Sequence, residues 1–355
     1  MTTPARISML RLALLLTAAG AAAWAAACGG GAGDSGRPAT PALHAPRDVI
    51  AFGAEAAGGG YALYLVQPDG TGLRKLSDER AAVSFPRWSP AGDRIAYIVG
   101  GDGGPAALRL YDFATGAART LSEQALPGDA FTLSWSPDAG RLAFIEDVAG
   151  GRLRVYDFEQ DRLLDDAGLP AVAVDWSRSG ERLAVIRPAQ TSVYTVKPDG
   201  SPERFMLEGN ALLSDPRWAP DGTLALSSAP SAQLSGRTLA LYGPDGGDFR
   251  DLGAGLEPAW SADGRLAYSR PASAVAGADF DIYLVAPEAG ATQRVTRATT
   301  RDRWPSWAPA GDALAYMAQA ALETSFLCVV DLATGGQSCL ELPGLQPSQA
   351  DWSPF

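Results

Sequence analysis

The sequence predicts an all-β fold, a seven-bladed β-propeller, from a repeated tryptophan phrase, the regular spacing of that phrase and an incomplete unit at each end. Each phrase has the form Trp-Ser/Ala-x-x-Gly-x-x-Leu/Ile-Ala, followed by an aromatic or aliphatic residue. Seven tryptophans begin such a phrase: Trp88, Trp135, Trp176, Trp218, Trp260, Trp307 and Trp352. The intervals between them average about 44 residues, which is the period expected of a four-stranded propeller blade.

Each phrase predicts a strand, a tight turn and a second strand. In copies such as Trp218-Ala219-Pro220-Asp221-Gly222, Pro presets φ, Asp can bond its own backbone and Gly accepts a positive φ. A third strand, another turn and a short fourth strand follow, so that each unit forms one antiparallel sheet. Examples of the predicted third and fourth strands are Leu108–Phe113 with Ala118–Leu121, Ser192–Val196 with Glu203–Leu207, Asp281–Val285 with Gln293–Thr296, and Phe326–Asp331 with Ser338–Leu342.

The two ends of the repeat region complement each other. Residues 48–77 predict three strands without a preceding tryptophan phrase: Asp48–Phe52, Tyr61–Val66 and Leu73–Leu76. The sequence ends at Asp351–Phe355, a Trp strand with no strands after it. We expect this strand to pair with the three N-terminal strands as one composite blade, which leaves no open sheet edge around the circle. A linear solenoid is the alternative, and it leaves both partial units unexplained.

The repeats resemble the TolB-type, WD-repeat-like β-propeller family. The residues that carry the resemblance are Trp88-Ser89-Pro90, Trp135-Ser136-Pro137-Asp138 and Trp218-Ala219-Pro220-Asp221-Gly222, each before an Ile/Leu-Ala-aromatic or aliphatic strand. The resemblance covers residues 48–355 and implies the propeller architecture. The chain departs from TolB in two ways, because seven blades are predicted where TolB has six and no separate α/β domain is predicted before them.

The N-terminal residues 1–27 are predicted to be a signal peptide. Arg6 and Arg11 precede an apolar run from Leu12 to Ala27, which is short for a membrane span. Small residues before Cys28 resemble the lipobox of bacterial lipoproteins, in which the cysteine thiol receives a diacylglycerol. An ordinary signal peptide that leaves Cys28 as a free thiol is the alternative.

Residues 28–47 are predicted to be the lipidated cysteine and a flexible linker. This stretch is rich in Gly, Ala and Pro and cannot bury a core, so it would act as a tether between a membrane and the propeller. The prediction is therefore an exported protein of the bacterial cell envelope, lipid-anchored at the outer membrane or the cell surface.

The other two cysteines, Cys328 and Cys339, lie on the strands that flank a predicted turn. If Asp331 pairs with Gly336, the same register places the two cysteines opposite each other. An exported chain meets an oxidising compartment, so we expect a disulfide bond between them. Two buried free thiols are the alternative.

Several kinds of chemistry lack their residues in this sequence. The single histidine, His44, lies in the linker, so the propeller has no imidazole for a triad or a proton shuttle. No Walker-type phosphate loop occurs, and no cofactor or metal is predicted. Carboxylates are plentiful, so a carboxylate-based hydrolase or a calcium-dependent lactonase stays open. Five aspartates lie in Asp-Gly turns, where each is expected to cap its own turn rather than bind calcium: Asp69, Asp199, Asp221, Asp245 and Asp263.

Charged side chains form several candidate binding surfaces in this sequence. The net charge is −11, and removal of Arg6 and Arg11 with the signal peptide makes it more negative, so nucleic acid is a poor partner. Two local clusters have a functional and a structural interpretation. The acidic cluster Asp161, Asp165 and Asp166 is expected to be a solvated face, and Arg297, Arg301 and Arg303 beside Trp304 could bind a carbohydrate or a peptide carboxylate or be surface residues only.

The residue before each tryptophan is expected to face a central channel. Among these residues, Arg87 and Arg217 could meet Asp175 and Asp351. One interpretation is a polar mouth for a peptide or a small anion. The other, which we favour, is that the charges pair with each other and with the backbone.

Three functions follow from these observations. The leading hypothesis is a noncatalytic, membrane-tethered scaffold that recognises an envelope protein or a glycan. The alternatives are a propeller hydrolase or lactonase-like enzyme that uses channel carboxylates with a divalent cation, and a structural part of a larger envelope complex.

Overall fold

The computed structural model describes residues 46–100, 106–127, 131–164, 169–199, 202–208, 211–230, 236–272, 279–286, 291–297, 299–320 and 324–355. All the described residues belong to one compact unit. The described part of the chain is all-β and contains no α-helix. It contains no helix that is long and apolar enough to cross a membrane. The predicted signal peptide, Cys28 and His44 lie outside the described residues.

The strands follow one another in groups of four. The Trp strands are β4 (Val83–Trp88), β8 (Leu133–Trp135), β12 (Ala173–Trp176), β16 (Leu212–Trp218), β20 (Leu256–Trp260), β24 (Arg301–Trp307) and β28 (Leu345–Trp352). The second strands are β5 (Arg94–Gly100), β9 (Arg141–Glu146), β13 (Leu183–Ile186), β17 (Leu224–Ala229), β21 (Leu266–Pro271), β25 (Ala313–Gln319) and β1 (Ile50–Ala56). Six Trp strands pair antiparallel with the second strand across the turn that the phrase predicts. The seventh, β28, pairs antiparallel with β1 from the other end of the repeat region.

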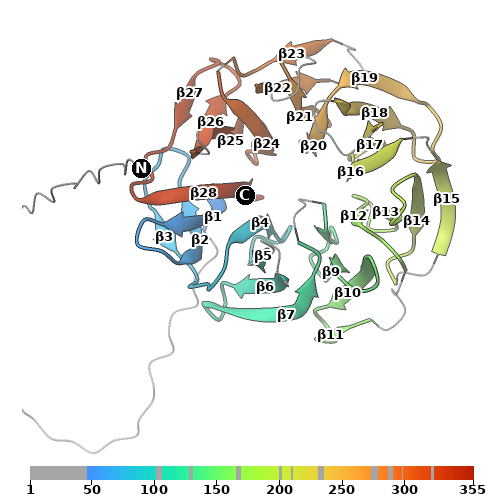
Figure 1. The fold of residues 1–355 in the computed structure, drawn as a ribbon, viewed down its shortest axis with the longest axis horizontal. Coiled ribbons are helices and arrows are strands. Elements are labelled where there is room, and N and C mark those ends of the chain that lie inside the picture. The colour runs from blue at the N-terminus through green and yellow to red at the C-terminus, as the bar shows by residue number, and fades with distance from the viewer. Residues whose placement is uncertain are drawn as a thin grey trace, which may run out of the picture. The chain divides into compact units, whose positions relative to one another are not determined.

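Two outer strands complete each group. The third strands are β6 (Ala106–Asp112), β10 (Arg152–Asp157), β14 (Ser192–Val196), β18 (Thr238–Tyr242), β22 (Phe280–Val285), β26 (Ser325–Asp331) and β2 (Tyr61–Val66). The fourth strands are β7 (Ala117–Ala125), β11 (Arg162–Leu163), β15 (Pro202–Glu208), β19 (Arg250–Ala254), β23 (Thr292–Arg294), β27 (Gln337–Cys339) and β3 (Arg74–Lys75). Figure 1 shows the groups arranged around a common centre, with the Trp strands innermost and the fourth strands outermost.

Strand pairing within the groups is antiparallel and in chain order. Three sheets have four strands, and two larger sheets each join two groups through a single pair of residues. One link pairs β7 with β9 through Ala125 and Glu146, and the other pairs β22 with β24 in parallel through Phe280 and Arg301. The observed strands agree with the predicted runs to within a few residues. The main differences are that β7 is longer than predicted and that β27 ends at Cys339.

The predicted pairing between the two ends of the repeat region is present in the structure. β28 pairs antiparallel with β1, with Ile50 opposite Trp352, in the sheet order β28-β1-β2-β3. The backbone N–H of Asp48 donates to the carbonyl of Phe355 at 2.5 Å, and Nε1 of Trp352 donates to Oδ1 of Asp48 at 2.9 Å. The pairing register shifts at Gly53. The backbone of Val83 approaches closely there, and a Cβ atom on residue 53 would lie 2.1 Å from the carbonyl oxygen of Val83, so only glycine fits.

The hydrophobic core lies between neighbouring strand groups, as the repeat predicted. One cluster joins Ala51 and Leu63 of the first group to Trp88, Ile95 and Tyr97 of the next, and all five are buried. Small alanines beside large rings allow the sheets to approach, and each buried aromatic side chain removes roughly 150–250 Å² of surface from water. Face-to-face packing of neighbouring sheets therefore supplies the burial that one four-stranded group lacks.

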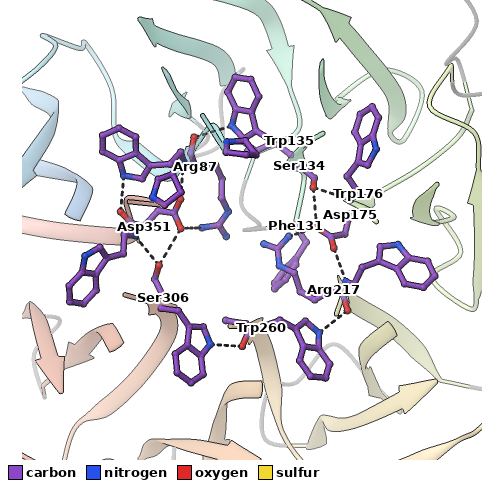
Figure 2. A pocket seen from close by; sticks show the side chains of 18 of the residues that line it. Arg87, Phe131, Ser134, Trp135, Asp175, Trp176, Arg217, Trp260, Ser306 and Asp351 are labelled. Carbon is purple, nitrogen blue, oxygen red and sulfur yellow. Dashed lines mark hydrogen bonds and ion pairs between the residues drawn. The ribbon is translucent and has the colours of Figure 1, made fainter. Parts of the chain in front are cut away.

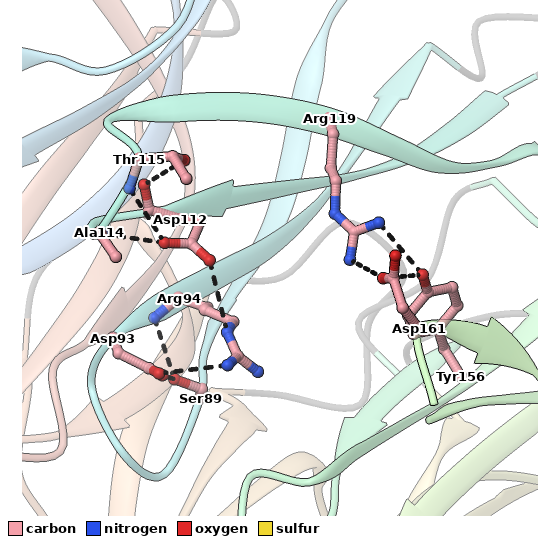
Figure 3. Close-up of polar contacts among 9 residues, drawn as sticks. All are labelled: Ser89, Asp93, Arg94, Asp112, Ala114, Thr115, Arg119, Tyr156 and Asp161. Carbon is pink, nitrogen blue, oxygen red and sulfur yellow. Dashed lines mark hydrogen bonds and ion pairs between the residues drawn. The ribbon is translucent and has the colours of Figure 1, made fainter. Parts of the chain in front are cut away.

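Polar side chains also connect neighbouring groups at the surface (Figure 3). Arg119 of β7 donates to the hydroxyl of Tyr156 at 3.1 Å and to Oδ1 of Asp161 at 2.8 Å, and the Tyr156 hydroxyl donates to the same carboxylate at 2.6 Å. Asp161 thus bonds across two groups and is not only a solvated side chain. Asp165 and Asp166, the rest of the predicted acidic cluster, lie outside the described residues.

The turns and the disulfide follow the predicted local chemistry. Oδ1 of Asp69 accepts the N–H of Thr71 at 2.8 Å, and Oδ1 of Asp221 accepts the N–H of Thr223 at 2.8 Å, so both aspartates cap their own turns. The carboxylate of Asp263 binds Ser261 and Arg265, and that of Asp245 binds Arg204. Cys328 lies opposite Cys339, and the two form a disulfide bond.

Candidate functional site

A cavity of about 370 Å³ lies where the Trp strands converge. Its lining includes all seven tryptophans of the repeat. It also includes the six polar or charged residues that directly precede a repeat tryptophan, which Figure 2 labels: Arg87, Ser134, Asp175, Arg217, Ser306 and Asp351.

The four charged residues predicted for the channel mouth lie in this pocket as two ion pairs. Nη1 of Arg217 is 2.7 Å from Oδ1 of Asp175, and Nη1 of Arg87 is 3.6 Å from Oδ1 of Asp351. Their side chains are largely buried, so water screens these pairs less than it screens surface pairs. The favoured structural interpretation of these charges, mutual pairing, is therefore what the structure shows.

Each ion pair continues into a serine from the preceding Trp strand. Ser134 Oγ donates to Oδ1 of Asp175 at 3.0 Å, and Ser306 Oγ donates to Oδ1 of Asp351 at 3.3 Å. Two Ser–Asp–Arg relays result, Ser134–Asp175–Arg217 and Ser306–Asp351–Arg87, each spanning three successive Trp strands (Figure 2).

The relays also hold the backbone of the next Trp strand. The N–H of Trp176 donates to Ser134 Oγ at 3.0 Å, and the N–H of Trp218 donates to Oδ2 of Asp175 at 2.8 Å. The second relay makes the same two bonds: the N–H of Trp352 donates to Ser306 Oγ at 2.9 Å, and the N–H of Trp88 donates to Oδ2 of Asp351 at 2.8 Å. The Ser or Asp side chain before one tryptophan thus accepts the backbone N–H of the tryptophan on the neighbouring Trp strand. For Asp351 on β28, that neighbouring strand is β4.

The indole N–H groups form a further set of contacts between neighbouring strands. Nε1 of Trp135 donates to the carbonyl of Arg87 at 3.1 Å, and Nε1 of Trp260 donates to that of Arg217 at 3.1 Å. Trp88 and Trp307 make the equivalent bond to the carbonyls of Asp351 and Ala259. Tryptophan suits this position because its ring fills the core while its N–H finds a polar partner.

Five Trp strands show a shift in pairing register a few residues before the tryptophan, and in four of them the residue three positions before the tryptophan has a positive φ. The bulged residues adopt the left-handed conformation, with φ of 50° at Phe85, 55° at Asp215, 58° at Glu257 and 53° at Trp304, and the pairing register shifts there. Each is followed by proline, so the sequence signal is x-Pro-x-Trp, which the repeat analysis missed. Bulges redirect side chains and are frequent beside functional sites.

At two of the bulges the residue with positive φ is itself acidic, Asp215 and Glu257, and its carboxylate accepts a backbone N–H from the next Trp strand. Oδ2 of Asp215 accepts the N–H of Glu257 at 3.2 Å, and Oε2 of Glu257 accepts the N–H of Trp304 at 3.1 Å. Glu257 also accepts from Ser269 Oγ at 2.8 Å and forms an ion pair with Arg303. The guanidinium of Arg303 lies 4.2 Å from the ring centroid of Trp304.

This geometry separates the basic cluster that the sequence suggested. Arg303 is bound to Glu257 beside the central pocket, and Trp304 lines that pocket. Arg297 lies instead in a second cavity near β23. The guanidinium and the indole therefore do not form one exposed carbohydrate-binding cluster with Arg297.

The charges that remain available to a ligand are few. Burial raises the pKa of Asp351 above its ordinary value, although the positive charge of Arg87 and the N–H of Trp88 act in the opposite direction. Arg178, in the turn after Trp176, lines the pocket, is exposed and forms no ion pair within the described chain. The ring of Phe355, 48 % exposed, lies at the same pocket.

The arrangement suits binding through shape, aromatic surface and one exposed cation. Asp175, Glu257 and Asp351 all line the pocket, but each carboxylate is already bound to an arginine. Among the residues that the structure describes, no group of three or more His, Cys, Asp or Glu side chains is placed to hold a metal ion.

Comparison by sequence finds partial similarity to proteins of different kinds. No family model matches the chain. A TolB homolog from Chlorobium luteolum is 26% identical over 144 residues, which is 40% of this chain and 32% of that protein. A probable dipeptidyl peptidase 4 from Neosartorya fischeri is 26% identical over 147 residues, 37% of this chain and 16% of that protein. The matched segments thus span a third or less of these relatives.

Comparison by structure shows the fold. TolB from Acinetobacter baumannii superposes with a TM-score of 0.58 at 15% identity and covers 87% of this chain and 68% of that one. The β-propeller domain of the trilobed protease from Pyrococcus furiosus gives a TM-score of 0.62 at 15% identity, with 83% and 95% covered. An oligogalacturonate lyase in complex with manganese gives 0.55 at 19% identity, with 82% and 83% covered. These structures show that the fold is a β-propeller similar to that of TolB.

Proposed function

We propose that this protein is a noncatalytic lipoprotein of the bacterial cell envelope, whose β-propeller is a rigid scaffold that recognises an envelope protein or a glycan. The β-propeller fold that the chain shares with TolB supports a scaffold role. Folds of this kind host many functions, so the site must indicate which one applies. The observation that carries it is the pair of Ser–Asp–Arg relays, which use the pocket charges to hold the Trp strands together.

The scaffold that we propose is a closed ring of seven blades formed by residues 48–355. Six blades would be the consecutive groups that begin with β4, β8, β12, β16, β20 and β24, and the seventh would be the sheet β28-β1-β2-β3. The antiparallel pair of β28 and β1 supports this count, because it joins strands from opposite ends of the repeat region.

The membrane anchor belongs to the same proposal. Residues 1–27 would be removed as a signal peptide, and the lipid on Cys28 would hold the ring through the linker of residues 28–47. A single Ala25-Ala26-Ala27-Cys28 sequence and the acidic body support attachment through lipid rather than through a basic surface. Mass spectrometry of the mature N-terminus tests this anchor, and an unmodified Cys28 thiol would favour an ordinary signal peptide.

The site of recognition in this proposal is the mouth of the central pocket. Arg178 contributes an exposed cation, and Trp304 and Phe355 contribute ring surface. Arg217 is unsuitable as a probe of binding, because its reversal would break the ion pair with Asp175 and displace a side chain that lies 4.5 Å from the ring of Phe131.

The test is to purify the full mature protein from its own membrane after cross-linking and to identify what accompanies it. We expect Arg178→Glu to reduce recovery of the partner several-fold, while Arg80→Glu, an equal charge change at an exposed arginine outside the pocket, leaves recovery unchanged. Equal recovery with both variants would remove the central pocket as the recognition site. Recovery of a fixed set of envelope subunits with both variants would favour the structural-component hypothesis.

A carboxylate-based hydrolase or lactonase-like enzyme is the second candidate. It is favoured by the three pocket carboxylates, Asp175, Glu257 and Asp351, and by the peptidases and the lyase that share this fold. Its requirement is a divalent cation at carboxylates that now bind arginines. Calorimetric titration with Ca²⁺ and Mn²⁺ distinguishes the candidates, because saturable binding that is lost in Glu257→Gln would support the enzyme.

A further inference from the structure

A second cavity, of about 610 Å³, lies on the outer side of the fold and shares no lining residue with the central pocket. One wall is the edge strand β23 with the residues around it, and the other is the turn between β26 and β27. Figure 1 places β23 and β27 on the outer rim, away from the converging Trp strands. We call this cavity the outer groove.

The outer groove is locally positive in an acidic protein. Its charged lining residues are Arg265, Arg294, Arg297 and Asp331, whereas the whole chain has a net charge of −11. Arg265 forms a salt bridge with Asp263, and Arg294 forms one with Asp281. Neither aspartate lines the groove. Arg297 is exposed, lines the groove and makes no salt bridge within the described residues, although its charge also acts on Asp281.

The one acidic lining residue is engaged by its own turn. The carboxylate of Asp331 accepts the N–H of Thr334 at 2.7 Å and its hydroxyl at 2.8 Å. These hydrogen bonds from Thr334 lower the pKa of Asp331 and keep its carboxylate bound to its own turn. The excess of guanidinium groups therefore favours an anionic occupant.

The backbone of β23 supplies a second feature of the groove. This three-residue strand pairs with β22 alone, and no other strand of the described chain pairs with its outer edge. Its three side chains are exposed, so a peptide could approach without displacing them from a core. A free edge offers alternate N–H and C=O groups to an added strand, which is the basis of peptide recognition by β-augmentation.

The floor of the groove is apolar and not aromatic. Leu284, Val295 and Leu332 line it, and no Trp, Tyr or Phe is among the lining residues. A sugar ring would have no aromatic face to stack on, whereas an extended peptide can place alternate side chains toward the floor and the arginines. The opposite wall is the hairpin that the Cys328–Cys339 disulfide closes, so it is held in place.

We propose that the outer groove binds an extended acidic peptide segment of a partner protein as an added strand on β23. Backbone hydrogen bonds to the edge provide the affinity, and the arginines select carboxylates on alternate residues. This inference goes beyond the function proposed for the central pocket and does not depend on it.

The experiment measures fluorescence anisotropy of a labelled (Glu-Val)₄ peptide with the full mature protein. We expect saturable binding that weakens with added salt and falls about five-fold in Arg297→Glu, a change typical for reversal of one exposed charge. Arg80→Glu, which lies outside the groove, is the matched control and should bind as the wild type does.

Two further probes separate strand addition from simple charge attraction. A (Glu-Val)₄ peptide with N-methylated valines keeps its charges but loses backbone donors, so strand addition requires its binding to be lost. Equal binding of the N-methylated peptide, equal binding by Arg297→Glu, or tighter binding of an oligogalacturonate than of the peptide would each overturn the proposal. Because these variants leave Arg178 intact, the result is independent of the test of the central pocket.

Discussion

At the scale of single residues, the position before each tryptophan decides how the centre of the molecule is held. Where this residue is Ser or Asp, as at Ser134 and Asp175, its side chain accepts the N–H of the next tryptophan. Where it is Arg, as at Arg217, it binds the neighbouring carboxylate. A residue type that suggested a binding site in the sequence thus also stabilises the fold.

The relay predicts that removing its central carboxylate is costly. Asp175→Ala would leave the largely buried Arg217 without its anion and the N–H of Trp218 without an acceptor, so we expect unfolding to become easier by about 3 kcal/mol. Chemical denaturation measures the change. Glu181→Ala, at an exposed residue of the next turn, should stay within about 0.5 kcal/mol of the wild type. An equal effect of both variants would contradict the role of the relay.

A buried carboxylate near the outer groove makes stability depend on pH. Asp302 is fully buried, and burial raises its pKa, although hydrogen bonds from Thr296 and Thr300 oppose this shift. The folded protein therefore retains this proton at a pH where the unfolded chain has lost it. The resulting stabilisation is present below the unfolded pKa and is lost as the pH rises through the folded pKa.

The substitution Asp302→Asn removes this ionisation and keeps a side chain of the same shape. We expect its Tm relative to the wild type to increase as the pH is raised from about 4 to about 7. Thermal denaturation at several pH values measures the difference. Asp147→Asn, at an exposed aspartate, provides the comparison and should give a flat difference. A difference that shrinks with rising pH would show that the sign is wrong.

At the scale of elements, the turns and bulges direct the strands. Local chemistry sets the ordinary turns, as the Asp221 cap shows. The bulges differ, because a left-handed Phe85 or Trp304 before proline is unfavourable in isolation and must be stabilised by its surroundings. At Trp304 the N–H bond to Glu257 provides part of that stabilisation.

The β26–β27 hairpin predicts a measurable effect of its disulfide. Cys328 and Cys339 are 11 residues apart, and in the chain-entropy model closing so short a loop stabilises the fold by about 2–3 kcal/mol. The double variant Cys328→Ala/Cys339→Ala should lose this amount in denaturation experiments, and a reducing agent should destabilise only the wild type. Two reactive thiols in the denatured, unreduced protein would contradict the bond.

At the scale of the whole molecule, two kinds of contact stabilise the fold: contacts between the two ends of the repeat region and contacts between neighbouring sheets. The carboxylate of Asp351 binds the N–H of Trp88, 263 positions away in sequence. Trp352 is buried in the cluster that contains Ile50 and Phe52. The last strand is therefore part of the core and not a terminal extension.

The pairing of β28 with β1 predicts that a substitution at Trp352 changes the stability of the first strand. Trp352→Ala should cost about 3–5 kcal/mol and lower the hydrogen-exchange protection of β1 amides in particular, because it removes the ring that packs beside them. Trp218→Ala has a similar buried ring and should affect β16 and β17 instead. Unchanged protection of β1 in Trp352→Ala would show that β28 does not stabilise β1 in this way.

The sequence by itself determined the features that repeat locally. The tryptophan phrase fixed the order of strands and turns, and counting from the Asp331 turn placed Cys328 opposite Cys339. It also placed β28 beside β1, because an incomplete unit at each end requires its missing strands. The predictions of turns and of the cysteine pair succeeded because turn chemistry and strand alternation depend on neighbouring residues, whereas the pairing of β28 with β1 followed from counting the strands in each repeat.

Only the tertiary structure decided which charges are used and which remain free. Arg217 could have faced a ligand, but the position of Asp175 on the adjacent strand makes it part of a relay. Arg297 and Arg303 are six positions apart, yet one lines the outer groove and the other binds Glu257 beside the central pocket. The physical reason is that a side chain's partner depends on distances across sheets, which the order of residues along one strand does not encode.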